Sequence, residues 1–574
     1  MKIILGINDM VDPSISLVKD GKLLFYIEEE RLNRIKHSHN IFPIKSIEMA
    51  LKRFDISIDD LQCISYNWDF NKYSGGYMKN FFRKFNTKYR VDQNTIKWQK
   101  ERLNKRNLIN FKKKLEFNLR KKFEFSKLPP IKFFSHHFVH AFQSHFHSGF
   151  RNSLCITIDG SGEENCTVIW KCKNNKFSKL KEINMPNSLG WFYAAITEYL
   201  GFKAYDGEYK LMGLASYGKS NKNIEKKLNK VLKINHKTNE YELNPKYIHH
   251  GKHSFSGRYT DNLVKLFGKV PRKENQKIKS WHKDLAFEVQ SQLERAVLNL
   301  FKKYSVLTGI NNLTIGGGVG LNVKMNSKLF NSKFCSNIFP NPLCADNGAS
   351  AGSAMVADFI LNKKKPKILK SLALGPDYSE KEIIKALKQN KIKFYKKRNI
   401  ERYAAHKISQ GKVIGWFQGR MEAGARALGQ RSILGDPRKK EMSAKINKII
   451  KYRESWRPFC PSVLEEQVKK YFLKSYESKF MTISFEAKKK LKKIAPAIVH
   501  IDNTCRIQSV QKINNSRFYK LINEFFEITK VPMLLNTSFN VKGEPIVCSP
   551  NDAIRTFYST GLDELIINNF VIKK

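Results

Sequence analysis

Two histidines and two aspartates in the first two thirds of the chain have types and spacing suited to metal binding. His136 and His140 are four residues apart, so on a helix they lie on the same face, where two imidazoles can hold one ion. Asp159 ends an apolar, β-branched run, and strand ends are where ligands gather in α/β sheets. Asp346 opens a second helix-like stretch. The four residues predict a mixed nitrogen and oxygen site for Fe, Mn or Zn.

The histidine pair alone is a weak signal, because most pairs at this spacing are packing or surface residues. A third ligand is needed, and the two aspartates are the candidates. His147 is not a candidate, since it lies eleven residues beyond His136, roughly 16 Å along a helix.

A second group of residues, in the last third of the chain, is rich in arginine. Four arginines stand among glycines in residues 419–438, and further arginine motifs follow at 451–459 and 502–508. The planar fork of arginine pairs bidentately with phosphate and carboxylate oxygens, which lysine cannot do. Because lysine is the abundant cation of this chain, clustered arginine is more informative. The alternative is a set of structural pairs with Asp or Glu.

Length and composition predict a globular protein of two or more domains. The chain has 574 residues, with 41% apolar and 12% aromatic residues. No stretch approaches the roughly 18 apolar residues of a membrane span, and the N-terminus reads as a first buried strand, not a signal segment. Nine cysteines, an odd number without a Cys-x-x-Cys pair, indicate reduced thiols and a cytoplasmic location.

The net charge is strongly positive, since 104 basic against 51 acidic residues give +53. Such a balance is typical of polyanion binding. The lysines, however, are spread along the whole chain together with abundant Asn, Ile and Phe, which favours genome composition over a nucleic-acid footprint. Only residues 78–132 concentrate basic and aromatic residues, in predicted amphipathic helices. These form either a solvated insertion or a wall of the substrate cleft.

The expected strands form a duplicated pattern. Three strands with polar turns are predicted at 3–8, 15–19 and 23–28, and again at 154–158, 166–171 and 177–183. Such a repeat resembles the actin, hexokinase and acetate kinase group of folds, in which ATP is held between two halves. Gly316, Gly317 and Gly318 then follow a strand, where backbone N–H groups can approach a nucleotide.

The domain boundary is expected near residues 361–372, a Lys-rich segment with one proline. This gives a first domain at 1–365 and a second at 366–574, with the option that the last strands pack back on the first domain. Residues 207–219 have closely spaced Gly, Lys and Glu, which favours a functional loop over a core element.

With these motifs in place, the chain resembles the O-carbamoyltransferases that modify nodulation factors, cephamycins and aminoglycosides. The resemblance extends in order over nearly the whole sequence, and its arginine motifs are highly specific. The segments that carry it are 6–21, 28–37, 135–141, 157–164, 207–219, 316–326, 345–352, 419–438, 453–464, 500–510 and 534–550.

The resemblance implies an actin-like first domain, similar to the enzyme that transfers threonylcarbamoyl to tRNA, and a second α/β domain that forms carbamoyl-adenylate. It implies Fe(II), with Mn or Zn as alternatives, and ATP and carbamoyl phosphate as co-substrates with Mg. Carried over by position, the metal ligands are His136, His140, Asp159 and Asp346. The ATP loop is Gly316, Gly317, Gly318 and Asn322, the carbamoyl-phosphate and nucleotide site is Arg426, Arg431, Arg457, Arg506 and Asn536, and Lys36 is a first-domain site residue.

The chemistry expected of the arginines is charge neutralisation. Carbamoyl phosphate and ATP are both polyanions, so several cations are needed to hold them in line. A metal ion in the first domain would polarise the adenylate phosphate while an acceptor hydroxyl attacks the carbamoyl carbon. No residue pattern indicates a covalent enzyme intermediate.

One position departs from the family. Members usually have His-Asp where this chain has Val11-Asp12, and that histidine is thought to be the general base for the acceptor. Valine cannot take a proton. Either His37 or Asp12 substitutes, or the acceptor is unusual, or transfer is slow.

The leading hypothesis is therefore an ATP-dependent O-carbamoyltransferase acting on a sugar-type hydroxyl. A tRNA threonylcarbamoyl-type transferase is the alternative that the charge favours, and a transfer-deficient binding homologue is the one that Val11 favours. The expected partner is a small-molecule or saccharide acceptor, with its pocket shaped by residues 70–130 and 220–285, and nucleic acid is not expected. The oligomeric state stays open, with a homodimer as one option.

Overall fold

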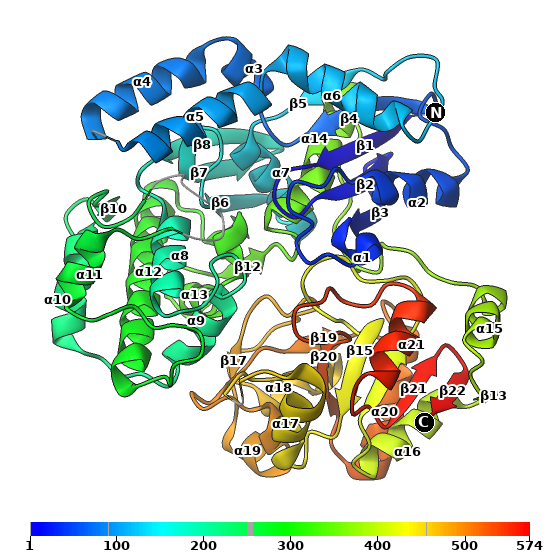
Figure 1. The fold of residues 1–574 in the computed structure, drawn as a ribbon. Helices are drawn as coiled ribbons and strands as arrows, with labels where there is room; N and C mark the ends of the chain where they lie inside the picture. Colours follow the sequence, from blue (N-terminus) through cyan, green and yellow to red (C-terminus); the bar gives the residue numbers. More distant parts are fainter. Residues whose placement is uncertain (1, 90, 250–256, 455) are drawn as a thin grey trace. The chain divides into compact units, whose positions relative to one another are not determined.

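The computed structural model describes residues 2–89, 91–249, 257–454 and 456–574, which group into two compact units (Figure 1). The first unit comprises Met1–Asn8, Ser16–Lys22 and Leu51–Ile368. The second comprises Asp9–Ile15, Leu23–Ala50 and Leu369–Lys574. Two short N-terminal segments thus group with the second unit, although the sequence predicts one continuous first domain from residue 1 to 365.

Two five-stranded sheets repeat the same topology, as the sequence predicts. The first has the order β3-β2-β1-β4-β5 and the second has the order β12-β11-β6-β7-β8. Read from the β8 end, the second order places its strands as the first does. The bounds are β1 (Ile3–Asn8), β2 (Ser14–Lys19), β3 (Lys22–Glu28), β4 (Leu61–Tyr66), β5 (Ile131–Phe133), β6 (Asn152–Ile158), β7 (Asn165–Lys173), β8 (Lys176–Asn184), β11 (Asn312–Gly316) and β12 (Asn337–Pro340).

The second of these sheets has β6 at its centre. This strand pairs antiparallel with β7 and parallel with β11, with Thr157 opposite Gly316 in the parallel register. Its residues from Ser153 to Ile158 are all buried, as expected for a strand covered on both faces. The carboxyl ends of β6 and β11 therefore meet at one edge of the sheet. The repeated topology confirms the predicted actin- and hexokinase-like α/β fold.

Helices cover these sheets and form an insertion. Helices α5 and α6 confirm the amphipathic helices predicted between residues 78 and 132, and in Figure 1 they lie beside α4. The bounds are α1 (Glu30–Asn33), α2 (Ile44–Phe54), α3 (Phe70–Ser74), α4 (Tyr77–Tyr89), α5 (Gln93–Lys105), α6 (Leu108–Arg120), α7 (His136–Ser148), α8 (Leu189–Tyr199), α9 (Glu208–Ala215), α10 (Lys222–Val231), α11 (Asp261–Phe267), α12 (Ser280–Thr308), α13 (Val323–Phe330) and α14 (Ala349–Asn362), with a β9 (Leu232–Asn235) and β10 (Glu240–Leu243) hairpin.

The segment 207–219 is not the loop that its composition predicts. Residues Glu208–Ala215 form α9, and Leu211–Ala215 are buried. The apolar residues Leu211, Met212 and Leu214 outweigh the flanking glycines, because burying them stabilises a helix turn more than glycine costs.

The second unit is built on one mixed sheet of order β13-β22-β21-β14-β15-β20-β16-β19. Its last strands, β21 and β22, pair with each other inside this sheet. The bounds are β13 (Phe394–Lys396), β14 (Ile414–Phe417), β15 (Arg431–Gly435), β16 (Cys460–Leu464), β19 (Gln508–Val510), β20 (Met533–Ser538), β21 (Glu564–Ile567) and β22 (Phe570–Lys573), and the helices are α15 (Glu380–Gln389), α16 (Ile400–Ser409), α17 (Glu441–Ile446), α18 (Val468–Tyr471), α19 (Lys489–Ile494), α20 (Ser516–Thr529) and α21 (Pro550–Tyr558), with a β17 (Phe485–Glu486) and β18 (Thr504–Cys505) pair.

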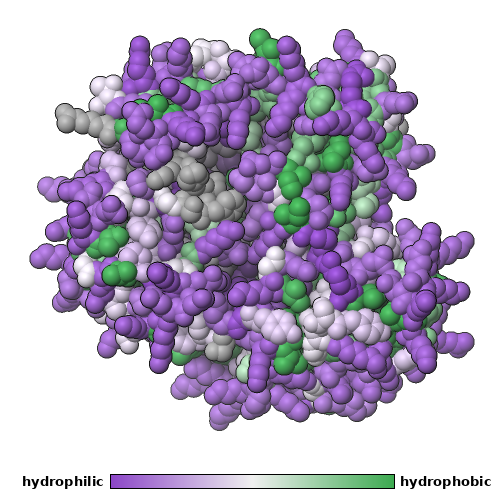
Figure 2. Space-filling model, viewed as in Figure 1, coloured by the Kyte–Doolittle hydropathy of each residue, from purple (hydrophilic) through white to green (hydrophobic). Residues whose placement is uncertain are grey.

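The surface and the cysteines agree with the composition. Hydrophilic side chains cover most of the face drawn in Figure 2. All nine cysteines are free thiols, and eight of them are buried, with Cys335 partly exposed. Within the described ranges, every helix is too short or too polar to cross a membrane.

Candidate metal centre and cationic cluster

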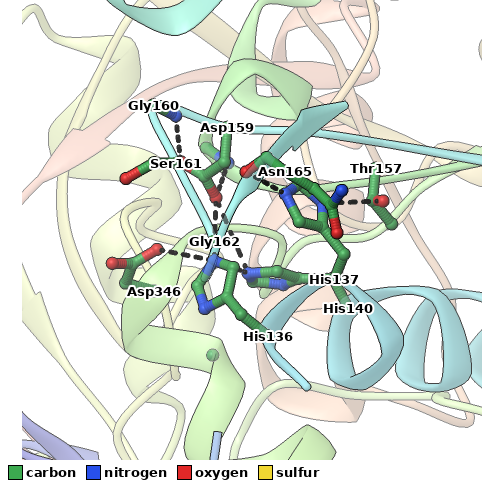
Figure 3. Close-up of polar contacts among 12 residues, drawn as sticks. His136, His137, His140, Thr157, Asp159, Gly160, Ser161, Gly162, Asn165 and Asp346 are labelled. Atoms are coloured by element: carbon green, nitrogen blue, oxygen red, sulfur yellow. Dashed lines mark hydrogen bonds and ion pairs between the residues drawn. The ribbon is translucent and has the colours of Figure 1, made fainter. Parts of the chain in front are cut away.

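The four predicted metal ligands converge in the first unit (Figure 3). The Nε2 atoms of His136 and His140 lie 3.2 Å apart. Asp159 Oδ2 lies 3.5 Å from His136 Nε2 and 3.6 Å from His140 Nε2. Asp346 Oδ1 lies 3.7 Å from His136 Nε2. One ligand atom from each residue falls within 4.8 Å of the other three.

These separations suit one shared ion. Ligand atoms about 2.0–2.2 Å from a metal lie roughly 3.0–3.6 Å from each other in tetrahedral or octahedral geometry. Both imidazole rings are buried, and within the described ranges their Nδ1 atoms make no hydrogen bond. Two neutral imidazoles and two carboxylates are ligands that Fe, Mn and Zn share.

Helix α7 and a buried glutamate position the histidines. The helix begins at His136 after Ser135 and ends at Gly149, whose left-handed φ of 76° stops it. Glu163 is fully buried and accepts the His136 backbone N–H at 3.1 Å. Burial raises the pKa of Glu163, but the nearby His136 and the N–H groups of His136 and Asp69 outweigh this and leave it lowered. A carboxylate at this helix terminus is favoured by the helix dipole.

Asp159 is fixed at the junction of β6 and β11. Its Oδ2 accepts the Gly318 N–H at 3.0 Å, and its Oδ1 accepts the Gly160 N–H at 2.8 Å. Gly317 has a φ of 82°, and a Cβ there would lie 2.2 Å from the Ile158 carbonyl oxygen. Only glycine therefore permits the approach that brings the Gly318 N–H onto Asp159.

Charges within the group are mutually stabilising. Burial lowers the pKa of His136, but the carboxylates of Asp159 and Asp346 outweigh burial and leave that pKa raised. Burial and the charge of His136 lower the pKa of His140 well below its usual value. The pKa of Asp159 is lowered because the two imidazoles offset the cost of its burial. Such a group carries negative charge once both imidazoles are neutral, as a cation requires.

The predicted ATP loop has mostly local partners. Gly318 donates its N–H to Asp159, as above. Asn322 is the N-cap of α13, accepting the Met325 N–H at 2.9 Å, and it exchanges two 2.9 Å hydrogen bonds with Gln290. In this structure the turn of Gly316, Gly317 and Gly318 therefore supports the metal group, and nucleotide binding by this loop stays a prediction.

A cationic cluster lies in the second unit, around residues 451–457. Lys451 is fully buried, and its Nζ donates to Ser538 and to Asn540 Oδ1 at 2.7 Å. Burial and the charges of Arg453 and Arg457 lower the pKa of Lys451 well below its usual value. Burial lowers the pKa of Arg453, and the charges of Arg457 and Arg506 lower it further. Cations held close together at this cost are typical of polyanion sites.

The predicted arginines divide into two kinds. Arg457 and Arg506 belong to the cluster, with Arg457 3.9 Å from Glu454 and Arg506 Nε 3.1 Å from Cys460 Sγ. Arg431 is fully buried over the Phe417 ring, and its guanidinium donates to the carbonyls of residues 376, 418, 419, 430 and 548. Arg431 thus holds loops of its own unit together.

Arg426 and Asn536 flank one loop of this unit. Arg426 is half-buried in the segment before β15. Asn536 is buried on β20, where its Nδ2 donates to Ala427 at 3.1 Å and to Ser462 at 2.9 Å. Its Oδ1 is buried without a hydrogen-bond partner in the described part of the chain. An amide oxygen in that state is suited to accept a hydrogen bond from a ligand.

The first-domain candidates lie in the segments that group with the second unit. His37 Nδ1 is 2.6 Å from Asp12 Oδ1, and the His37 N–H donates to Glu30 at 2.7 Å. Lys36 is half-buried beside them in sequence. A carboxylate on one imidazole nitrogen fixes the ring and favours proton transfer at the other.

The sequence analysis gave no individual role to three residues of these sites, namely Glu163, Lys451 and Arg453. Glu163 follows Asp159 by four residues, so proximity to a ligand was its only signal. Lys451 and Arg453 belong to the 451–459 arginine motif that the sequence analysis singled out, but the sequence did not show that both lie close to Arg457 in the fold.

Comparisons with known proteins agree with this arrangement. The sequence models "Carbamoyltransferase N-terminus" and "Carbamoyltransferase C-terminus" match residues 3–355 and 405–574. The Synechocystis protein sll1178 is 34% identical over 614 residues, which cover 100% of this chain and 96% of that protein. Nodulation protein NolNO of Sinorhizobium fredii is 34% identical over 577 residues, covering 98% and 79%. Component A of (R)-2-hydroxyglutaryl-CoA dehydratase from Acidaminococcus fermentans is 14% identical, covering 62% and 97%, with a TM-score of 0.33 that is too low to support an argument.

A duplicated α/β unit with a His/Asp group and a second α/β unit with a cationic cluster define a two-part α/β enzyme. The two sequence models together cover most of the chain, and NolNO matches nearly all of it. This chain belongs to the carbamoyltransferase family, and it is a transferase.

Proposed function

We propose that this protein activates carbamoyl phosphate with ATP to carbamoyl-adenylate and transfers the carbamoyl group to a hydroxyl of a sugar-containing acceptor. The observation that carries the proposal is the cationic cluster of Lys451, Arg453, Arg457 and Arg506, which the second unit holds together against mutual repulsion. Family membership supplies the carbamoyl group, and the similarity to nodulation protein NolNO favours a small-molecule acceptor.

The first half-reaction uses the cationic cluster. Water converts carbamoyl phosphate to carbamate and phosphate, a carbamate oxygen attacks the α-phosphorus of ATP, and pyrophosphate leaves. Both substrates are polyanions, so Arg457 and Arg506 would bind phosphate oxygens while Lys451 adds a fixed charge. Asn536 Oδ1, buried without a partner among the described residues, would accept a hydrogen bond from the carbamoyl amine.

The second half-reaction needs a general base. The acceptor oxygen attacks the carbamoyl carbon, the bond to AMP breaks, and the hydroxyl proton must be taken up. We assign this role to His37, whose ring Asp12 orients at 2.6 Å, in place of the family histidine that Val11 replaces. Lys36 would pair with the adenylate phosphate. A metal held by His136, His140, Asp159 and Asp346 of the first unit would supply Lewis-acid chemistry there.

The first half-reaction is tested by measuring pyrophosphate release from the purified chain without acceptor. ATP is supplied with and without carbamoyl phosphate and Fe(II). We expect release that depends on carbamoyl phosphate and that Arg457→Ala abolishes, whereas Arg120→Ala, an exposed arginine of α6, leaves it unchanged. Release that does not depend on carbamoyl phosphate, or no release with any metal supplied, would contradict the proposal.

The base assignment is tested with His37→Gln. General bases contribute about 10²–10⁴-fold to the reaction rate. With a hydroxyl compound that the enzyme accepts, carbamoyl transfer and the AMP release that accompanies it should fall by that factor. Pyrophosphate release should persist. Asp12→Asn should give a loss of similar kind, because a neutral amide cannot offset the positive charge that the ring gains when it takes up the proton. Unchanged transfer by His37→Gln would place the base elsewhere.

A second candidate is a tRNA threonylcarbamoyl-type transferase, which the charge of +53 favours. Phosphate contacts release counterions, so this candidate requires tRNA retention that weakens steeply with salt. Weak retention that is the same for tRNA and for heparin would indicate non-specific charge attraction and would count against this candidate.

A further inference from the structure

The helical insertion α4–α6 reaches the candidate metal centre through one arginine. Most charged side chains of these helices are exposed, but Arg102 of α5 and Arg106 at the C-cap of that helix are 6% and 9% exposed. The Arg102 guanidinium lies 4.9 Å from the ring centroids of both Trp68 and Trp98, so it is held between two indoles. An arginine in this setting has given up hydration, which its contacts must offset.

The hydrogen bonds of Arg102 go to the segment that directly follows Asp159. Its Nη1 donates to Ser161 Oγ at 3.2 Å, and its Nη2 donates to the carbonyls of Gly162 and, at 3.2 Å, Glu163. Its Nε donates to Tyr73 OH at 3.1 Å. The planar fork of arginine can satisfy three acceptors at once while stacking, which lysine cannot do.

The same arginine is linked to the histidine side of the centre. Trp68, which contacts the Arg102 guanidinium, also packs against the His136 ring in a tilted arrangement, with centroids 4.8 Å apart and planes 34° apart. Glu163, whose carbonyl Arg102 binds, accepts the backbone N–H groups of His136 and Asp69. Arg106 covers the Trp68 ring at 4.2 Å. Two of the four candidate ligands, Asp159 and His136, therefore adjoin groups that Arg102 contacts directly.

We propose that Arg102 is a positioning residue for the metal centre. It fixes the 160–163 loop and the Trp68 ring, and through them the Asp159 carboxylate and the His136 imidazole, so that the insertion sets metal affinity and coordination geometry. The inference rests on the proposed metal site but not on carbamoyl chemistry. A role in holding the insertion alone would not alter the coordination of an ion.

Cobalt(II) binding to the purified full-length chain tests this proposal, because its visible absorption reports affinity and coordination number without any assay of activity. Groups that orient ligands typically contribute about 10–100-fold to metal affinity. We expect Arg102→Lys to raise the Co(II) Kd by about that factor and to change the band intensity. The matched control is Arg120→Lys, since Arg120 of α6 also stacks on a ring, that of Phe125, and donates to the Phe125 carbonyl at 3.2 Å, but lies in α6 away from the loop in sequence. It should keep the wild-type Kd and spectrum.

A second variant guards against loss of folding. Trp98 is half-buried, and its ring contacts are with Phe82 and Arg102, so Trp98→Leu perturbs only one face of the guanidinium. We expect a smaller increase in Co(II) Kd, with an unchanged far-ultraviolet circular dichroism spectrum. Wild-type Kd and spectrum in both folded variants would overturn the role of Arg102. A wild-type chain that binds no Co(II) would overturn the metal site itself.

Discussion

The two units hold buried charge in opposite ways. In the first unit, His136, His140, Asp159 and Asp346 bring acids and imidazoles together, and each lowers the cost of burying the other. In the second unit, Lys451, Arg453 and Arg457 place cations beside cations, and each raises the cost of the next. A group of the first kind can persist without a ligand. A group of the second kind points to an anion that offsets its repulsion, because mutual repulsion is otherwise a loss of stability.

The largest expected effect is a loss of metal affinity that is confined to the first unit. His140→Ala removes one of four ligand atoms, so metal affinity should fall by more than about 100-fold, the upper range for changes outside the ligand set. Isothermal titration with Zn(II) or Co(II) measures this. His145→Ala is the matched control, because His145 is buried on the same helix but bonds Ser153 at 2.9 Å. Pyrophosphate release by the second unit should survive His140→Ala, and its loss would show that the two functions are not separable.

A smaller effect is expected in the cationic cluster of the second unit. Lys451→Met keeps the hydrocarbon length but removes a buried cation whose neighbours repel it. We expect the KM for carbamoyl phosphate to rise about 10- to 100-fold, as for one charge-assisted contact of roughly 1.5–3 kcal/mol.

Thermal unfolding provides the other measurement on Lys451→Met. Because the unliganded cluster is self-repulsive, the unfolding midpoint should stay equal or rise in spite of the lost hydrogen bonds to Ser538 and Asn540. Lys448→Met, on the neighbouring turn, is the control for a nearby lysine. A marked fall in the midpoint with an unchanged KM would make Lys451 a structural cation.

The smallest effect, a shift of a few degrees in an unfolding midpoint, concerns a half-buried acid outside both groups. Burial raises the pKa of Glu208 to about 7, so between pH 4.5 and 7 the folded chain binds more protons than the unfolded chain and stability falls as pH rises. Glu208→Gln removes this pH-dependent penalty.

Thermal unfolding at two pH values measures the Glu208 effect. The Glu208→Gln midpoint should exceed the wild-type midpoint by a few degrees at pH 8 and match it near pH 4. Glu101→Gln, at an exposed position of α5, should show no such difference. A Glu208→Gln advantage that is equal at both pH values would rule out the titration of this carboxyl as the cause.

The sequence predicted the first unit better than the second, for a physical reason. Alternating and continuous apolar runs gave β1, β6 and the repeated topology, and a helical spacing of four gave His136 and His140. Both signals are local, since they depend on periods of two and 3.6 residues. The prediction of a loop at 207–219 was wrong because it gave more weight to the glycines than to the apolar residues. Leu211–Ala215 are buried in α9.

The functional roles of single cations could not be predicted from sequence. Arg431 and Arg457 belong to neighbouring arginine motifs, yet Arg431 packs over Phe417 and donates to backbone carbonyls while Arg457 stands among cations. Which one faces a ligand depends on the tertiary neighbours of each guanidinium. Arg102 shows the same limit, because its sequence context is a lysine-rich helix and its partners are 59 to 61 residues away in the chain or on other elements.

Each unit contains buried thiols whose labelling rate reports how often that unit opens. Cys63, Cys155, Cys166, Cys172 and Cys344 are buried in the first unit, and Cys460, Cys505 and Cys548 are buried in the second. A thiol becomes reactive only when the structure around it opens. Counting modified cysteines against time by mass spectrometry would therefore resolve the opening of each unit separately. Addition of a metal ion should slow labelling in the first set, and addition of carbamoyl phosphate should slow it in the second.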